Sequence, residues 1–264
     1  MPTKLSLIIV LIIFLGGCSS IESLYARYSY DFHQYENEER IHYESGIEEL
    51  ARLAMEYLDK CESEVAKVEY IPFKNFTRIN VYIFSDYERY AVYSNTNGGR
   101  ASSSKDDIFV SPTLMNEKES LSGIFKHELS HIHLRQYVGS WTYVYGIPAW
   151  FKEGLAVVTS DGAGAEGVTD KEAIFSILDG HHFNPEEGTG VFNLKHAHDY
   201  GLKPHMFYRQ AGLFVSFLKD INEPAFEKSY MGLISGEEFE EVWLQYYDRS
   251  IAKLWEEFIS KIKA

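Results

Sequence analysis

Two histidines four residues apart, His127 and His131, lie in a segment whose apolar residues recur at the spacing of an α-helix. These apolar residues are Leu121, Ile124, Phe125, Leu129, Ile132 and Leu134. Because residues four apart share one face of a helix, the segment can present two imidazoles to one metal ion. Glu128 lies about 100° further round, where its carboxylate can reach a water beside the ion without binding the ion. The pattern predicts the centre of a zinc hydrolase; the alternative is a solvated helix with incidental histidines.

Residues 148–156 offer the third ligand that such a centre needs. A catalytic zinc usually has three protein ligands and an open fourth position, and Glu153 can complete the set. Pro148 suits the first turn of a helix, and the apolar residues that follow predict a helix buried on one side. They are Trp150, Phe151, Leu155, Val157 and Val158. Gly154 costs a helix about 1 kcal/mol relative to alanine, so it indicates the close approach of another backbone.

Together the two segments resemble the gluzincin metallopeptidases. That family combines His-Glu-x-x-His with a downstream Trp-x-x-Glu-Gly-x-Ala, which Trp150, Glu153, Gly154 and Ala156 match. The resemblance implies an α+β, zincin-like domain with a small mixed sheet, an active-site helix and a helical C-terminal part. It implies one Zn²⁺ held by His127, His131 and Glu153, with Glu128 as general base. The longer gap before Glu153 predicts a connecting loop over residues 137–146.

Two further expectations concern residues near this centre. Gluzincins often place a tyrosine or histidine opposite the zinc, and Tyr208 in Tyr-x-Gln-Ala-x-x-Phe resembles that position. Tyr200 and His205 are rivals for this role, and a tyrosine that only packs is the remaining alternative. A metzincin would need another histidine where the chain has Tyr137. His133 lies about 200° from His131 around the helix, so it is expected to pack or to be solvated.

The N-terminus has the features of an export signal. Lys4 precedes an apolar run over residues 5–15, too short for a comfortable membrane span. Leu15-Gly16-Gly17-Cys18 resembles the bacterial lipobox, which implies a signal peptide over residues 1–17, a lipidated Cys18 and a membrane tether over residues 18–38. Without an aspartate after Cys18, the resemblance implies a place in the bacterial cell envelope, at the outer membrane and facing the periplasm where the organism has one. An ordinary signal peptide or an uncleaved anchor are the alternatives.

Residues 39–264 are predicted to form one domain. We expect helices over residues 39–68, 86–93, 170–178 and 206–221, two short helices within residues 237–262, and strands over residues 77–84 and 107–112. Residues 108–111 are a candidate edge strand for pairing with an extended peptide, or an ordinary edge strand. Cys61 lies on an apolar stripe and is expected to be buried and not nucleophilic. His181, His182, His196 and His198 are expected in a solvated loop, with a second metal site as the alternative.

The predicted activity is zinc-dependent hydrolysis of peptide bonds in a peptide or protein substrate. Two other functions fit the same residues: a silent zinc-binding lipoprotein that acts as a scaffold, and a zinc hydrolase of non-peptide amides or esters. The net charge is −14, and the sequence contains no cluster of basic residues. Nucleic acid is therefore not an expected partner.

Overall fold

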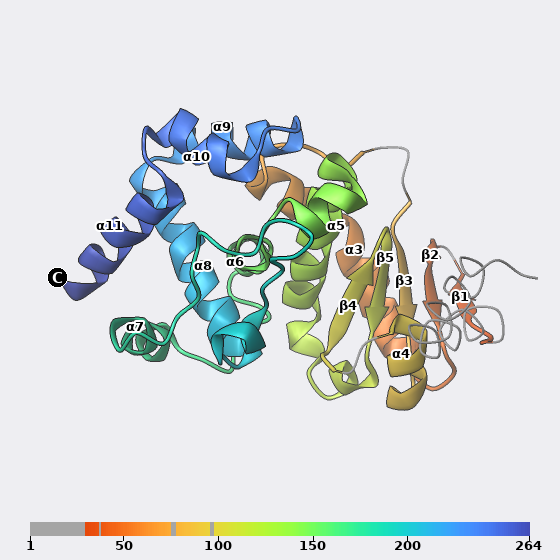
Figure 1. Ribbon diagram of the computed structural model, residues 1–264. Coiled ribbons are helices and arrows are strands. Elements are labelled where there is room, and N and C mark those ends of the chain that lie inside the picture. Colours follow the sequence, from red (N-terminus) through yellow and green to blue (C-terminus); the bar gives the residue numbers. More distant parts are fainter. Residues whose placement is uncertain (1–29, 37, 75–77, 96–97) are drawn as a thin grey trace, which may run out of the picture. The chain divides into compact units, whose positions relative to one another are not determined.

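The computed structural model describes residues 30–36, 38–74, 78–95 and 98–264. The expected signal peptide, Cys18 and most of the tether lie outside these residues. The described residues divide into two compact units, one within residues 30–57 and 78–121 and the other within residues 58–74 and 122–264. Figure 1 shows the strands in the first unit and most of the helices in the second, which confirms the α+β class.

The first unit is built on a mixed five-stranded sheet with the order β1-β2-β3-β5-β4. Its strands are β1 (His33–Tyr35), β2 (Glu38–Tyr43), β3 (Asn80–Ile83), β4 (Ala101–Ser104) and β5 (Asp107–Val110). The pairs β2/β3 and β3/β5 are parallel, whereas β1/β2 and β4/β5 are antiparallel. The small mixed sheet expected from the sequence is therefore present, and β1 forms from residues that were expected to belong to the tether.

Apolar residues of the strands and of helix α4 form the core of the first unit. Val81 and Ile83 of β3 are fully buried, and the strand is paired on both sides, by β2 and β5. Helix α4 (Tyr87–Ser94) begins at Asp86, whose side chain accepts a hydrogen bond from the Arg89 amide, a typical N-cap. Its residues Tyr90 and Tyr93 form an aromatic cluster with Phe84 and Phe109. Short 3-10 turns η1 (Pro112–Met115) and η2 (Lys118–Ser120) follow β5.

Three predictions about regular structure were wrong. The helix predicted over residues 39–68 is shorter, because residues 38–43 form β2 and helix α3 spans Glu48–Val68. Gly46, with a positive φ of +90°, lies in the turn between the two elements. The predicted loop over residues 137–146 is largely helical, because α5 (Leu121–Tyr145) continues through a kink at Gly139. Residues 108–111 do not offer a free edge for a peptide, since β5 pairs with β3 and β4.

The second unit is helical apart from its loops. After α5 come α6 (Ala149–Thr159), α7 (Asp170–Leu178), the 3-10 turn η3 (Ala197–Tyr200), α8 (Pro204–Ile221), α9 (Glu223–Ile234), α10 (Phe239–Tyr247) and α11 (Ile251–Lys263). Helix α9 was not predicted. The core is rich in aromatic rings, and Phe183, from the long loop after α7, packs between Trp150 and Trp255. That loop is therefore anchored, although it was expected to be solvated.

Helices α6 and α8 pack unusually closely. A Cβ added at Gly154 would lie 2.6 Å from the Ala211 carbonyl oxygen, and one added at Gly212 would lie 2.6 Å from Val157 Cγ1. The backbone contact that Gly154 predicted is thus present. The buried residues of α6 include Trp150, Phe151 and Leu155, as predicted. This contact fixes the position of Glu153 relative to α8.

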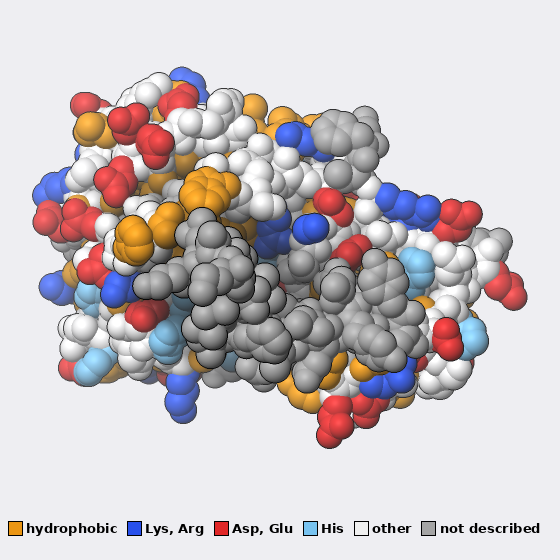
Figure 2. Space-filling view, turned by 45° about the vertical axis from the view of Figure 1, so that its right-hand side comes forward, with side chains coloured by type: hydrophobic (Ala, Val, Ile, Leu, Met, Phe, Trp, Pro, Cys, Tyr) orange, Lys and Arg blue, Asp and Glu red, His pale blue; other side chains and the backbone are white. Residues whose placement is uncertain are grey.

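Two surface properties bear on the expected setting of the protein. Among the described residues, every helix is too short or too polar to span a bilayer. On the face shown in Figure 2, the acidic and basic side chains of the described residues are interspersed.

Cys61 is fully buried, as predicted, and burial raises the pKa of its thiol.

Candidate metal centre

Helix α5 brings His127 and His131 together on one face, as their spacing predicts. The helix forms because Phe125, Leu129 and Ile132 are fully buried at helical intervals. The two imidazole rings lie 4.9 Å apart between centroids, and their Nε2 atoms are separated by 3.3 Å. Both side chains are buried, so the pair lies beneath the surface of its unit.

Glu153 of α6 completes the cluster. Its Oε2 atom lies 3.5 Å from the Nε2 atom of His127 and 3.5 Å from that of His131. One ligand atom from each of the three residues lies within 4.8 Å of the others, so the group could hold a metal ion. The sequence located all three residues, although it placed a loop between the two helices that carry them.

The far side of each imidazole has its own partner. His127 Nδ1 lies 3.0 Å from the Ala163 carbonyl oxygen, to which it donates, and this leaves the Nε2 lone pair for an ion. His131 Nδ1 lies 3.1 Å from the Tyr143 hydroxyl. Ala163 has no side-chain signal in the sequence, although the glycines at positions 162 and 164 hint at a tight turn beside it.

Tyr143 was missed by the sequence reasoning. It follows the kink at Gly139, which returns the chain towards the face of α5 that carries His131. Two cations surround its ring: the Arg135 guanidinium at 4.2 Å and the Lys152 ammonium at 4.8 Å from the centroid. Lys152 Nζ also donates to the Tyr143 carbonyl at 2.8 Å, and burial lowers the pKa of Lys152 to about 8. These contacts hold Tyr143 against His131.

The electrostatics favour an ionised carboxylate in the cluster. Burial alone would raise the pKa of Glu153, but the charge and hydrogen bond of His131 and those of His127 outweigh it and hold this pKa well below its usual range. Burial opposes the charged form of His127, yet its bond to Glu153 and the charge of Glu128 raise its pKa overall. A cation placed between the three side chains would therefore meet a negatively charged ligand.

Two further predicted residues lie next to the cluster. Glu128 is 8% exposed and makes no hydrogen bond or ion pair with another described residue. Its charge acts on His127, Tyr143 and Tyr208. The Tyr208 ring, at the start of α8, lies 6.2 Å from the His127 ring. The negative charge of Glu153, followed by burial and the charge of Glu128, raises the pKa of Tyr208 far above its usual value, so its hydroxyl keeps its proton.

The rivals of Tyr208 have other partners. The Tyr200 hydroxyl donates to the Asn184 carbonyl at 3.4 Å, and its ring stacks on Phe207. His205 Nδ1 accepts a hydrogen bond from the Gly167 amide at 3.1 Å. Among the three candidates, Tyr208 is thus the one whose ring contacts the His127 ring.

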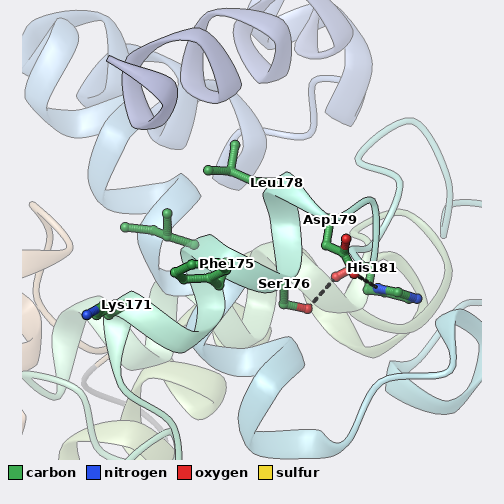
Figure 3. A pocket seen from close by; sticks show the side chains of 7 residues that line it. Lys171, Phe175, Ser176, Leu178, Asp179 and His181 are labelled. Atoms are coloured by element: carbon green, nitrogen blue, oxygen red, sulfur yellow. Dashed lines mark hydrogen bonds and ion pairs between the residues drawn. The ribbon is translucent and has the colours of Figure 1, made fainter.

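The four loop histidines do not form a second metal group among the described residues. His181 is exposed and lies 3.1 Å from Asp179, in an open pocket over α7 that Phe175 and Leu178 also line (Figure 3). In the same view Ser176 bonds to the backbone of His181. The His182 ring packs on Trp255. His133 was expected either to pack or to be solvated, and it packs in a fully buried contact with Glu69.

The residues of the cluster fit a divalent metal ion. Two Nε2 atoms and a carboxylate oxygen converge, and each imidazole has its other nitrogen engaged by an oxygen, the usual arrangement of ligating histidines. The two Nε2 atoms lie 3.3 Å apart, and each lies 3.5 Å from Glu153 Oε2. An ion placed among these three atoms would contact all of them.

Changing Gly164 to alanine is expected to weaken metal binding by displacing His127. Gly164 has a φ of +85°, and an added Cβ would lie 2.7 Å from His127 Cε1. Gly180→Ala is a matched control, because Gly180 has a φ of +84° and nothing within 4 Å of an added Cβ. Both variants carry a backbone strain of about 1–2 kcal/mol, so only Gly164→Ala should lose metal affinity in a competition titration. Equal affinities in the two variants would contradict this.

Changing Tyr143 to phenylalanine removes the hydroxyl beside His131 Nδ1 but keeps the ring between Arg135 and Lys152. We expect metal affinity to fall by about 10–100-fold, the usual effect of losing the partner of a ligating histidine. The control is Tyr137→Phe, whose hydroxyl donates to the Pro72 carbonyl. A chelator competition assay measures both, and a loss shared by the control would count against a role specific to Tyr143.

Comparison with known proteins gives no independent assignment. No protein-family model matches the chain, and no curated protein matches it significantly.

Proposed function

We propose that the chain is a zinc-dependent hydrolase of peptide bonds, of the gluzincin type and with a zincin-like fold. The observation that carries the proposal is the convergence of His127, His131 and Glu153 next to a buried carboxylate, Glu128, that has no bonding partner among the described residues. Two histidines and a glutamate are a ligand set of catalytic zinc sites. A structural site would instead be closed by a fourth protein ligand.

The roles of the side chains follow from their positions. When bound, zinc would act as a Lewis acid and lower the pKa of its water towards about 7. Glu128 accepts a proton from the attacking water and passes it to the leaving amine, a role worth about 10²–10⁴-fold. Tyr208, which keeps its proton, donates a hydrogen bond to the oxygen that becomes negatively charged on the substrate. Ala163 and Tyr143 orient the two imidazoles.

The proposal extends to where the enzyme works. The sequence around Cys18 resembles a lipobox, so we place the enzyme in a bacterial cell envelope, held to the membrane by acyl chains on Cys18. Labelling cells with a radioactive or clickable fatty acid should mark the wild-type chain. A Cys18→Ala variant should remain unmarked, and a marked Cys18→Ala variant would overturn the anchor.

The activity is tested with the full chain in detergent and zinc. A mixture of unstructured peptides is incubated with the protein and the products are read by mass spectrometry. We expect new termini that disappear with a chelator and return with added zinc. Intact peptides, together with hydrolysis of simple esters or acylated amines, would replace peptide hydrolysis by the non-peptide alternative. Intact substrates of every class would leave the metal-binding scaffold.

A further inference from the structure

A small pocket opens directly beside the metal-ligand cluster. Its volume is about 220 Å³, and both Glu153 and Tyr208 line it. It is smaller than the roughly 300–1,000 Å³ of pockets that hold a whole drug-sized ligand. A space of this size next to a ligand and the proposed hydrogen-bond donor fits one side chain of a longer substrate.

The wall of the pocket is mainly apolar. It is contributed by the start of α6, by η3 and by the start of α8, through Ala149, Ala197, Leu202, Pro204 and Phe207. No lysine, arginine or aspartate lines it, and its single carboxylate, Glu153, belongs to the metal-ligand group. An acidic substrate side chain would lose its hydration here without meeting a lysine or arginine, and a basic one would meet only the carboxylate that the metal-ligand group already uses.

Two histidines complete the lining. The rings of His196 and His198 are nearly parallel, at 10° and with centroids 6.2 Å apart. The turn that carries them is fixed by Asp199, whose carboxylate accepts a hydrogen bond from the His196 amide at 2.7 Å. Flat rings offer both an apolar face and a ring edge, so they suit contact with an aromatic or branched aliphatic group.

We propose that this pocket binds one large apolar side chain of the substrate, aromatic or branched aliphatic, and so selects the bond that is cleaved. The proposal rests on the proposed function for the meaning of "substrate". The pocket itself is a binding site whether or not turnover follows. The loop that carries His196 and His198, for which the sequence indicated no particular specificity, then has the role of completing this subsite.

Binding is measured on the zinc-loaded Glu128→Gln protein, which is expected to bind peptides without cleaving them. The probes are pentapeptides Gly-Gly-Xaa-Gly-Gly in which Xaa is phenylalanine, leucine, alanine, aspartate or lysine, titrated by calorimetry. Burying a large apolar side chain should make the phenylalanine and leucine peptides bind at least about tenfold more tightly than the alanine peptide. The aspartate and lysine peptides should bind no better than alanine.

A filling variant locates the effect. Ala197→Leu places a larger side chain in the half-buried wall of the pocket, and Ala252→Leu makes the same change at a half-buried position of α11 outside it. We expect Ala197→Leu to abolish the preference for phenylalanine while the Kd of the alanine peptide changes by less than about twofold. Ala252→Leu should keep the preference. An undiminished preference in Ala197→Leu, or equal binding of all the peptides, would overturn the inference.

The two proposals fail in different ways. If wild-type protein cleaves none of the peptides but phenylalanine is still preferred in binding, peptide hydrolysis is wrong and the subsite stands. If wild-type protein cleaves the peptides with no preference among side chains, hydrolysis stands and the subsite is wrong.

Discussion

Replacing Glu128 with glutamine is expected to lower kcat by about 10²–10⁴-fold while the bound metal stays in place. Glutamine has nearly the same shape but cannot accept the proton of the attacking water. Glu128 makes no hydrogen bond or ion pair with a described residue, so the change removes a chemical group and leaves the packing as it is. The measurement is the rate of peptide cleavage, with the metal content determined on the same sample.

The control for this prediction is Glu64→Gln, at a carboxylate of α3 that is 42% exposed. It should leave both the rate and the metal content unchanged. If Glu128→Gln lost metal in proportion to its activity, Glu128 would have to act on the ligands and not on the water. A full rate with metal bound would remove Glu128 from the mechanism altogether.

Replacing Glu69 with alanine is expected to lower the free energy of unfolding by about 3–5 kcal/mol, because it leaves a buried polar group without its partner. Glu69 and His133 are fully buried and lie 2.7 Å apart, and Thr159 and Tyr230 also donate to the Glu69 carboxylate. His133 Nε2 lies 2.9 Å from the Ile71 carbonyl oxygen. The network therefore joins α5, α6 and α9 behind the face of α5 that carries His127 and His131.

Urea unfolding of the metal-free protein measures this effect without the stabilisation that a bound ion would add. Glu64→Ala is the matched control, since its exposed ion pairs with Lys60 and Lys126 should be worth about 0–1 kcal/mol. Because a domain is typically stable by only about 5–15 kcal/mol, the loss at Glu69 should be plain. Similar losses in the two variants would show that the buried network contributes no more than a surface pair.

The sequence predicted the residues of the centre where helical spacing fixes the relative positions of their side chains. The spacing of His127 and His131 allows one arrangement on a helix, and the glycine after Glu153 marked the close approach of α8 that the structure shows. The partners of the imidazoles were not readable. Tyr143 reaches His131 only through the kink at Gly139, and Ala163 acts through its backbone, so neither has a local pattern.

The errors in the fold have similar physical causes. The six residues of β2 include one fully buried side chain, Ile41, and their mixture of charged and apolar residues also suits an amphipathic helix. The strand is decided by pairing with β1 and β3, which are distant in the sequence or weakly patterned. In β4 the sequence Ala-Ser-Ser-Ser has no apolar alternation at all, and β4 is what covers the edge of β5 that was predicted to be free.

The most direct test of the three-ligand centre is the metal content of the full chain after dialysis against a small excess of zinc. Wild-type protein and the exposed-loop control Glu186→Ala are predicted to retain about one ion, and Glu153→Ala to lose most of it, since a catalytic site needs three protein ligands. Full retention of zinc by Glu153→Ala would show that the third ligand is another residue. A wild-type chain without metal would contradict the centre itself.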